Sequence, residues 1–171
     1  GRANCDHCRN AHTRGNTSNR WNSLDSQTLL ELKNSRFSSL ANLEQDLYYY
    51  NITCRHEDKW HLALISSYGN LIPFLNSLHQ LRIDRSHPDK ISIIPRGGWH
   101  FSYFGGVDAI INKIENLSAH TEIDRPEISN PEKIQKLVNE RKDILLRGET
   151  FEFIEPSDNE YLPMNYNMIM D

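Results

Sequence analysis

The chain has 171 residues, of which 37% are hydrophobic and 25% are charged, so it is long enough for one domain with a core and too short for two ordinary domains. Its formal net charge of -4 gives no electrostatic reason to expect nucleic acid or an anionic membrane as a partner. No apolar run approaches the roughly 18 residues that a membrane helix needs, so we expect no membrane segment in this chain.

The first 22 residues form a region of different composition. They carry four arginines and five asparagines but almost no aliphatic side chains. Such a segment cannot bury enough apolar surface to offset the entropy lost on ordering. The sequence therefore predicts a loose leader over residues 1–22 and a folded domain over residues 23–171.

The three cysteines, Cys5, Cys8 and Cys54, leave at least one thiol over if a disulfide forms, so they do not decide the redox compartment. Cys5 and Cys8, followed by His12, have the spacing of half a zinc knuckle. No second pair of ligands follows at a suitable spacing, because Cys54 and His56 stand in a different context. A zinc-binding interaction module is therefore the weakest of the functional alternatives.

Helix and strand patterns begin directly after the leader. A capping residue, Asp25, precedes the leucines of residues 28–33, which predicts a short helix. Alternation over residues 43–53 and the apolar run over residues 60–68 predict two strands. Pro73 and the leucines that follow it predict a helix ending near Arg82.

The middle of the chain predicts two more strands and the clearest helix. Residues 91–94 are a short apolar run, and residues 99–104 are an aromatic one. Apolar residues then recur at i, i+3, i+4, i+7 and i+10 over residues 107–117, which is the pattern of an amphipathic helix. This helix is expected to pack on a sheet or core.

The last third of the chain continues the mixture. Asn130 and Pro131 are typical of a helix start, and residues 151–154 predict a last strand. The tail over residues 156–171 has no period, but its tyrosines, methionines and Leu162 indicate that it lies against the body. Because strands and helices interleave, the fold class is α/β or α+β.

The stretch R-G-G-W-H-F-S-Y-F-G-G, residues 96–106, is the main candidate site. An extended strand places alternate residues on opposite faces, with Trp99, Phe101 and Tyr103 on one and His100, Ser102 and Phe104 on the other. Glycines at both ends, including Gly98, omit side chains where another backbone or a ligand approaches closely. The stretch is either a core strand with an incidental histidine or a sugar-binding strand whose aromatic faces pack on pyranose rings.

Two pairs of residues that include carboxylates are further candidates. His120 and Glu122 are two residues apart, so an extended backbone puts an imidazole and a carboxylate on one side, where they share a metal or a proton; a solvated loop is the alternative. Glu44 and Asp46 are either paired carboxylates or part of an exposed strand edge.

The order of several motifs resembles glycosyltransferase family 17. The motifs are L-L-E-L-K, L-E-Q-D-L-Y-Y-Y-N-I-T-C, G-G-W-H-F-S-Y-F-G-G, S-A-H-T-E, K-D-I-L-L-R-G and a late Y-L-P. The resemblance covers about Asp25 to Tyr166. Its most specific part is G-W-H-F-S-Y-F-G-G followed at this distance by H-x-E.

The resemblance implies an A-type glycosyltransferase fold and the activity of a β-1,4-mannosyl-glycoprotein 4-β-N-acetylglucosaminyltransferase. Such an enzyme transfers N-acetylglucosamine from a UDP-sugar to a mannose-containing N-glycan, with inversion, in the Golgi or the secretory-pathway lumen. A divalent metal, usually Mn²⁺, is implied at the donor diphosphate. The implied role of Glu122 is catalytic base, and His100 or His120 is the implied metal or diphosphate contact, with His100 taken as the metal contact. Substrate binding is implied for Gly98, Trp99, His100, Phe101, Ser102, Tyr103 and His120.

The chain departs from the family pattern at its start. Family members carry an acidic D-x-D-type motif just before the helix that here begins T-L-L-E-L-K, after a nucleotide-binding half. The corresponding place here reads R-W-N-S-L-D-S-Q, in which Asp25 is the single acid. The chain therefore resembles the C-terminal part of such an enzyme, an incomplete copy that lacks the nucleotide-binding half. The alternative function is a non-catalytic carbohydrate-binding remnant of the family.

Overall fold

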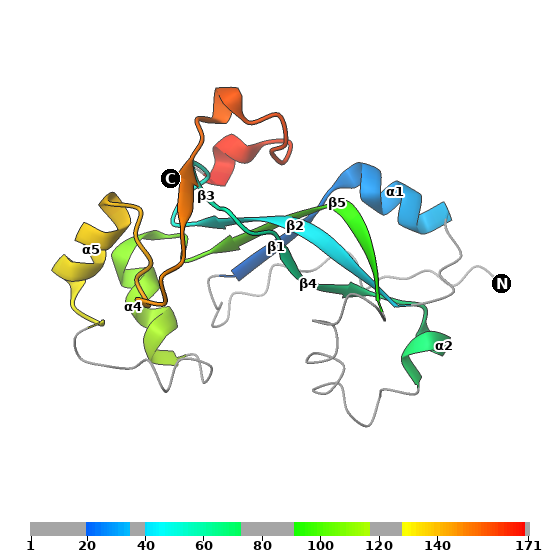
Figure 1. The fold of residues 1–171 in the computed structure, drawn as a ribbon, viewed down its shortest axis with the longest axis horizontal. Coiled ribbons are helices and arrows are strands. Elements are labelled where there is room, and N and C mark those ends of the chain that lie inside the picture. The colour runs from blue at the N-terminus through cyan, green and yellow to red at the C-terminus, as the bar shows by residue number, and fades with distance from the viewer. Residues whose placement is uncertain (1–19, 35–39, 73–90, 117–127, 170–171) are drawn as a thin grey trace.

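The computed structural model describes residues 20–34, 40–72, 91–116 and 128–169 (Figure 1). Within these ranges a six-stranded mixed sheet is combined with four α-helices, which confirms a mixed α/β fold. The strands are β1 (Arg20–Leu24), β2 (Ala41–Tyr49), β3 (Cys54–His56), β4 (Trp60–Ile65), β5 (Ser92–Ser102) and β6 (Phe151–Phe153). The helices are α1 (Ser26–Asn34), α2 (Tyr68–Leu71), α4 (Gly106–Asn116) and α5 (Pro131–Asn139), and the short 3-10 helices η4 (Pro156–Asp158) and η5 (Tyr166–Ile169) follow.

The sheet is built around the parallel pair of β2 and β5. Its strand order is β1-β5-β2-β3-β6, and β4 also pairs with β2. All pairs other than β2 with β5 are antiparallel. Because β2 has neighbours on both sides, most of its residues are buried.

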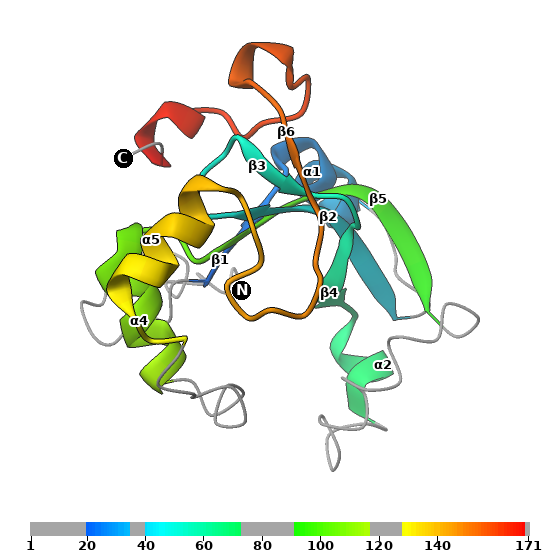
Figure 2. The same cartoon turned by 60° about the vertical axis from the view of Figure 1, so that its left-hand side comes forward.

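Alternate residues of β2 and β5 point to opposite faces of the sheet. The helix face is covered by α4 and α5, and the tail face is covered by the C-terminal segment, residues 155–169 (Figures 1 and 2). In the paired register Leu47 lies opposite His100 on the helix face, and Tyr48 lies opposite Phe101 on the tail face. The core on the helix face includes Tyr49, Tyr50, Cys54, Ile110, Ile114, Ile134 and Ile144.

The predicted helices in the described ranges are confirmed, with their caps. Asp25 accepts the N–H of Thr28 at 3.0 Å at the start of α1. Asn130 accepts the N–H of Lys133 at 3.0 Å at the start of α5. The stripe over residues 107–117 forms α4, whose Ile110 and Ile114 are fully buried. The helix predicted over residues 73–82 lies outside the described residues.

The strand predictions need three corrections. The separate strands expected over residues 91–94 and 99–104 are one continuous strand, β5. Pro95 is tolerated inside β5 because it falls in the register shift between the paired residues Ile94 and Gly98, where no ladder partner is assigned to it. The strand predicted over 60–68 ends at Ile65, before α2, and the strand predicted over 43–53 ends at Tyr49 because Tyr50 has a φ of 69°.

Two strands, β1 and β3, were not predicted from the sequence. β3 is only three residues long and is held between β2 and β6. β1 begins inside the predicted leader, because residues 20–22 pair with residues 100–102 of β5. The edge of β5 supplies backbone hydrogen-bond partners to residues 20–22, and this pairing cannot be predicted from the composition of these residues. Residues 1–19, with Cys5 and Cys8, lie outside the described part.

Candidate functional site

The candidate site is a pocket of about 170 Å³ on the helix face. Its floor is formed by β2 and β5, and its rim by the start of β4 and the connection between α5 and β6. A larger depression of about 730 Å³ between α4 and α5 is open and lined mainly by exposed polar side chains without an aromatic ring. We take the smaller pocket as the site because aromatic and charged groups converge in it.

One wall of the pocket is aromatic. Trp60 of β4 and His100 of β5 stand on either side of β2, and their rings are stacked with centroids 4.4 Å apart and planes 20° from parallel. Tyr49 and Tyr103 meet edge to face at 5.2 Å. All four rings line the pocket; Trp60 is half-buried, and His100, Tyr49 and Tyr103 are buried.

The other wall is polar and comes from the turn over residues 143–149, D-I-L-L-R-G-E. The buried carboxylate of Asp143 accepts the backbone N–H groups of Leu145 at 3.0 Å and Arg147 at 2.6 Å. Gly148 has a φ of 81°, a conformation that glycine adopts without strain, and it returns the chain toward the pocket. The turn therefore places Arg147 and Glu149 at the pocket rim.

The two charged residues of this turn connect to the sheet. The Arg147 Nη2 donates to the hydroxyl of Tyr49 at 3.3 Å and lies 3.3 Å from Glu149 Oε1. The other oxygen of Glu149 contacts Nε2 of His56 on β3. A chain of polar contacts thus runs from the turn to the sheet across one side of the pocket.

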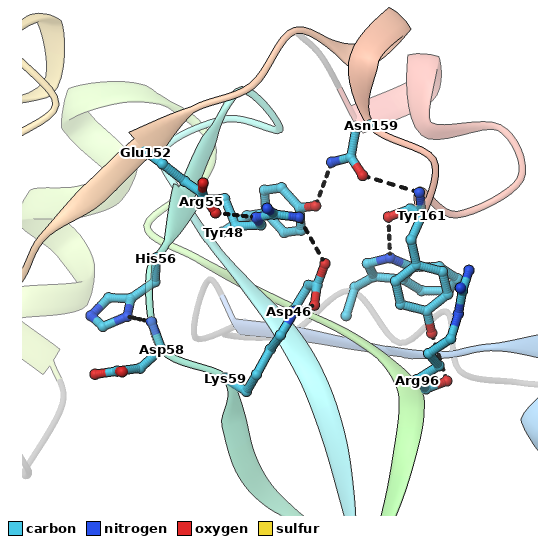
Figure 3. A network of polar contacts seen from close by, with 11 residues as sticks. Asp46, Tyr48, Arg55, His56, Asp58, Lys59, Arg96, Glu152, Asn159 and Tyr161 are labelled. Atoms are coloured by element: carbon cyan, nitrogen blue, oxygen red, sulfur yellow. Dashed lines mark hydrogen bonds and ion pairs between the residues drawn. The ribbon is translucent and has the colours of Figure 1, made fainter.

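The environment of His56 assigns its tautomer. The backbone N–H of Asp58 donates to Nδ1 of His56 at 2.9 Å, so Nδ1 is an acceptor (Figure 3). A neutral imidazole with an accepting Nδ1 carries its proton on Nε2, the atom that faces Glu149. His56 therefore donates to the Glu149 carboxylate and holds it in place.

The predicted site residues of β5 divide between the two faces. His100, Ser102 and Tyr103 line the pocket. The grouping of Tyr103 with Trp99 and Phe101 is wrong, because Tyr103 follows the end of β5 with a φ of 62° and packs with Tyr49 on the helix face. Regular alternation ends where the strand ends.

Ser102 and Tyr103 also contact a buried lysine. Lys113 of α4 donates from Nζ to Ser102 Oγ at 2.9 Å, and its Nζ lies 3.7 Å from the centroid of the Tyr103 ring. Lys113 is only 3% exposed. The helix after the aromatic stretch thus holds the end of β5 in position.

Trp99 and Phe101 belong to the tail face and are each 4% exposed. The Trp99 Nε1–H donates to the carbonyl of Tyr161 at 3.0 Å, and the two rings lie 4.6 Å apart. The C-terminal segment occupies the position that a sugar would need on these rings. Their role in substrate binding stays a prediction.

Gly98 is needed for the approach of another backbone. Its φ is 126°, and a Cβ at this position would lie 2.1 Å from the carbonyl oxygen of Ser23 in β1. A side chain there would collide with backbone atoms, which cannot move as a flexible side chain does. The glycine therefore lets β1 pair with β5, and its predicted contact with substrate stays a prediction.

The exposed-edge interpretation of Glu44 and Asp46 is wrong, because β2 is an inner strand of the sheet. Asp46 is 5% exposed, with Lys59 Nζ at 2.5 Å and Arg55 Nη1 at 3.5 Å. Arg55 also contacts Glu152 at 2.5 Å, so the charges form a network on the tail face (Figure 3). Its carboxylates are matched by cations, and the arrangement fits a structural role.

The predicted metal site is not assembled from the described residues. Among them, no three His, Cys, Asp or Glu side chains come together to hold a metal ion. His120 and Glu122 lie outside the described ranges, and the ring of His100 is stacked on Trp60. The Mn²⁺ site, the metal contact of His100 and the catalytic role of Glu122 therefore stay predictions.

Cys54 is a buried free thiol whose pKa is raised to about 11 by burial.

Apart from His100, Ser102 and Tyr103, the lining residues of the pocket had no predicted role, among them Tyr49, His56, Trp60, Arg147 and Glu149. The signal that existed was the segment K-D-I-L-L-R-G, which contributed to the family resemblance without an assigned chemistry. Thirty-five residues separate this segment from the aromatic stretch, which hides the contact. Only the sheet, which pairs β3 with both β2 and β6, brings these residues together.

Comparisons with known proteins identify no relative of this chain: no family model, no curated protein and no solved structure matches it. The similarity to glycosyltransferase family 17 therefore rests on the motifs alone. None of the helices in the described ranges is both long and apolar enough to span a membrane.

Proposed function

We propose that this chain is the acceptor-side part of an inverting, A-type glycosyltransferase similar to family 17. It transfers N-acetylglucosamine from a UDP-sugar to a mannose-containing glycan, and its expected compartment is the Golgi or the secretory-pathway lumen. The observation that carries the proposal is the pocket, in which the stacked Trp60 and His100 face the polar groups of Arg147 and Glu149.

The chemistry of this pocket suits a sugar. A pyranose ring has apolar C–H faces that pack on aromatic rings, and hydroxyl groups that need both donors and acceptors. A volume of about 170 Å³ is below the range of roughly 300–1,000 Å³ that is usual for drug-sized ligands. The pocket therefore suits a single sugar unit of a larger glycan.

Transfer also requires groups that act on the donor and on the attacking hydroxyl. A divalent metal, when bound, neutralises the charge that develops on the departing diphosphate. The predicted base Glu122 would remove the proton of the acceptor hydroxyl. The pocket residues of this chain orient the acceptor, which alone contributes a large part of the rate of a bimolecular reaction.

A second function, carbohydrate binding without transfer, is favoured by the position of Asp25. This residue is the single acid where the family has its D-x-D-type motif, and its carboxylate accepts the N–H of Thr28 as the cap of α1. A carboxylate used as a helix cap has fewer lone pairs left for a metal. The chain would then keep the acceptor pocket and lack the donor site.

Release of UDP separates the two functions. The transferase predicts manganese-dependent release of UDP from UDP-N-acetylglucosamine that increases when a mannose-containing acceptor is added. Binding of the acceptor by isothermal titration, without any UDP release, would support the carbohydrate-binding function. If the chain neither releases UDP nor binds a mannose-containing glycan, both functions are contradicted.

A further inference from the structure

The turn over residues 143–149 has features of a ligand-binding arm. Its buried Asp143 holds two backbone N–H groups of the turn and lies 3.5 Å from the Nε of Arg147, while the side chains of Arg147 and Glu149 remain 41% and 30% exposed. Rigid support behind partly accessible charged groups is the arrangement that binding sites need.

We propose that Tyr49, Arg147 and Glu149 bind two adjacent hydroxyl groups of a neutral pyranose, and that Asp143 is the positioning residue for this set. The inference rests on the proposed function, because it assigns the polar contacts of the same sugar pocket. The ligand class is a hexose with a vicinal diol, such as the mannose unit of the acceptor.

The three groups retain hydrogen-bonding capacity after their mutual contacts. A carboxylate has about four lone-pair sites and a guanidinium has five N–H groups. The described contacts of Glu149 use one site on each oxygen, toward His56 and Arg147. Glu149 can therefore accept from one sugar hydroxyl while Arg147 donates to its neighbour.

Tyr49 adds a second donor. Its hydroxyl oxygen accepts from Arg147, which leaves the hydroxyl proton for another partner. Burial is the main cause that raises the pKa of Tyr49, so the phenol keeps its proton at neutral pH. Two donors and one acceptor match a vicinal diol, in which each hydroxyl both donates and accepts.

The local charge balance favours a neutral ligand. The cation of Arg147 lies between the carboxylates of Asp143 and Glu149, and His56 is neutral in the tautomer that its contacts assign. Of the other cations near the pocket, Lys59 is paired with Asp46, and the buried Lys113 donates to Ser102. The set of Arg147, Asp143, Glu149 and His56 itself carries no surplus positive charge that would attract a phosphate or an acidic sugar. A carboxylate at the rim repels such ligands.

The first test measures the binding of methyl α-mannoside to the 171-residue chain by NMR titration. Glu149→Gln removes the charge with almost no change of shape, and we expect about a tenfold weaker affinity, because hydrogen bonds to charged groups are the stronger ones. Glu152→Gln is the matched control: the same substitution on the tail face, where Glu152 pairs with Arg55. We expect the control to bind like the wild type.

A second pair of variants keeps the test independent of any effect on His56. Tyr49→Phe removes one hydroxyl from the pocket, and Tyr48→Phe removes one from the adjacent residue, whose hydroxyl accepts from Asn159 on the other face. We expect a severalfold loss of affinity for the first and no change for the second. Equal affinity in Glu149→Gln and Glu152→Gln, together with equal affinity in the two tyrosine variants, would overturn the proposal.

Deoxy sugars test the diol and the role of Asp143. We expect the wild type to bind two deoxy analogues of methyl mannoside more weakly, namely those that lack one or the other of two neighbouring hydroxyl groups. We expect Asp143→Asn to bind all the analogues with nearly the same affinity. If Asp143 were needed only for stability, Asp143→Asn would lower the affinity for all the sugars by the same factor, and the order of their affinities would not change. If the wild type binds no sugar, the proposed function fails as well; if it binds and the ranking is the same in Asp143→Asn, only the positioning role fails.

Discussion

The helix face and the tail face of the sheet use neighbouring residues of β5 for different purposes. Trp99 points to the tail face, where the C-terminal segment covers it and bonds its indole N–H. His100 points to the helix face and stacks on Trp60 at the wall of the pocket. The comparison teaches that a single aromatic motif supplies both a sealed layer and a pocket wall, one residue apart.

The two faces also place their charged networks differently with respect to the pocket. On the tail face, Asp46 is buried with its cations Lys59 and Arg55, so the carboxylate is matched by protein groups. On the helix face, Arg147 and Glu149 remain partly exposed beside the pocket. Both networks combine one buried aspartate with partly exposed partners, since Lys59 is 43% and Glu152 is 41% exposed. The difference is that Arg147 and Glu149 both line the pocket.

Trp99→Ala is the strongest way to break the tail face. Removal of a buried aromatic side chain leaves a cavity under the C-terminal segment, and we expect the free energy of unfolding to fall by about 3–5 kcal/mol. Urea unfolding monitored by far-UV circular dichroism measures this loss. Under conditions where the variant remains folded, its affinity for methyl α-mannoside should equal that of the wild type. A large loss of affinity in the folded variant would instead support the substrate-binding role predicted for Trp99 from the family resemblance.

His100→Ala is the matched change on the helix face, and it should reverse the pattern. We expect the free energy of unfolding to fall by only about 1–2 kcal/mol, a typical value for a single substitution. Affinity for the sugar should fall about tenfold, because the stacked wall loses one of its two rings. Equal losses of stability and of binding, each expressed as a free energy, would favour the interpretation of His100 as an ordinary core residue.

Tyr161→Phe tests the tail face with the smallest expected effect on stability of the three substitutions. The Tyr161 hydroxyl donates to the carbonyl of Arg96 at 2.6 Å, and its loss should cost about 0.5–1.5 kcal/mol of stability with no change in sugar affinity. Burial, as the largest cause, raises the pKa of Tyr161 above its ordinary value of about 10.

The pH dependence of that bond follows from the direction of the shift. Because the pKa is raised in the folded state, the stabilisation is fully present below the unfolded pKa and is lost only as the pH rises through the folded pKa. The difference in stability between the wild type and Tyr161→Phe should therefore be constant from pH 6 to 9. A difference that disappears within that range would contradict the assigned bond.

Most elements of the fold were predictable because they depend on local pattern. The cap of α5 at Asn130 and the stripe of α4 follow from residues within a few positions of each other. The errors occur where pairing with a strand that is distant in the sequence determines the local structure. β3 is too short to have a pattern of its own, and β5 continues through Pro95 because β2 shifts its register there.

The candidate site was predictable on one side only. His100, Ser102 and Tyr103 were identified from the aromatic stretch and line the pocket. Arg147 and Glu149 were not, because their spacing from that stretch carries no signal in a single sequence. The predicted partners His120 and Glu122 lie outside the described residues, so that half of the predicted site remains to be tested.

By itself, the sequence determined the α/β class, the helix after the aromatic stretch, and the motifs that resemble a glycosyltransferase family. These properties depend on residue type and short-range period, which are local. The tertiary structure alone decided that Tyr103 joins the pocket, that Trp99 and Phe101 are covered by the C-terminal segment, and that the turn over residues 143–149 completes the polar wall. The reason is physical: pairing in the sheet and burial depend on which distant segments meet, and no local pattern encodes that choice.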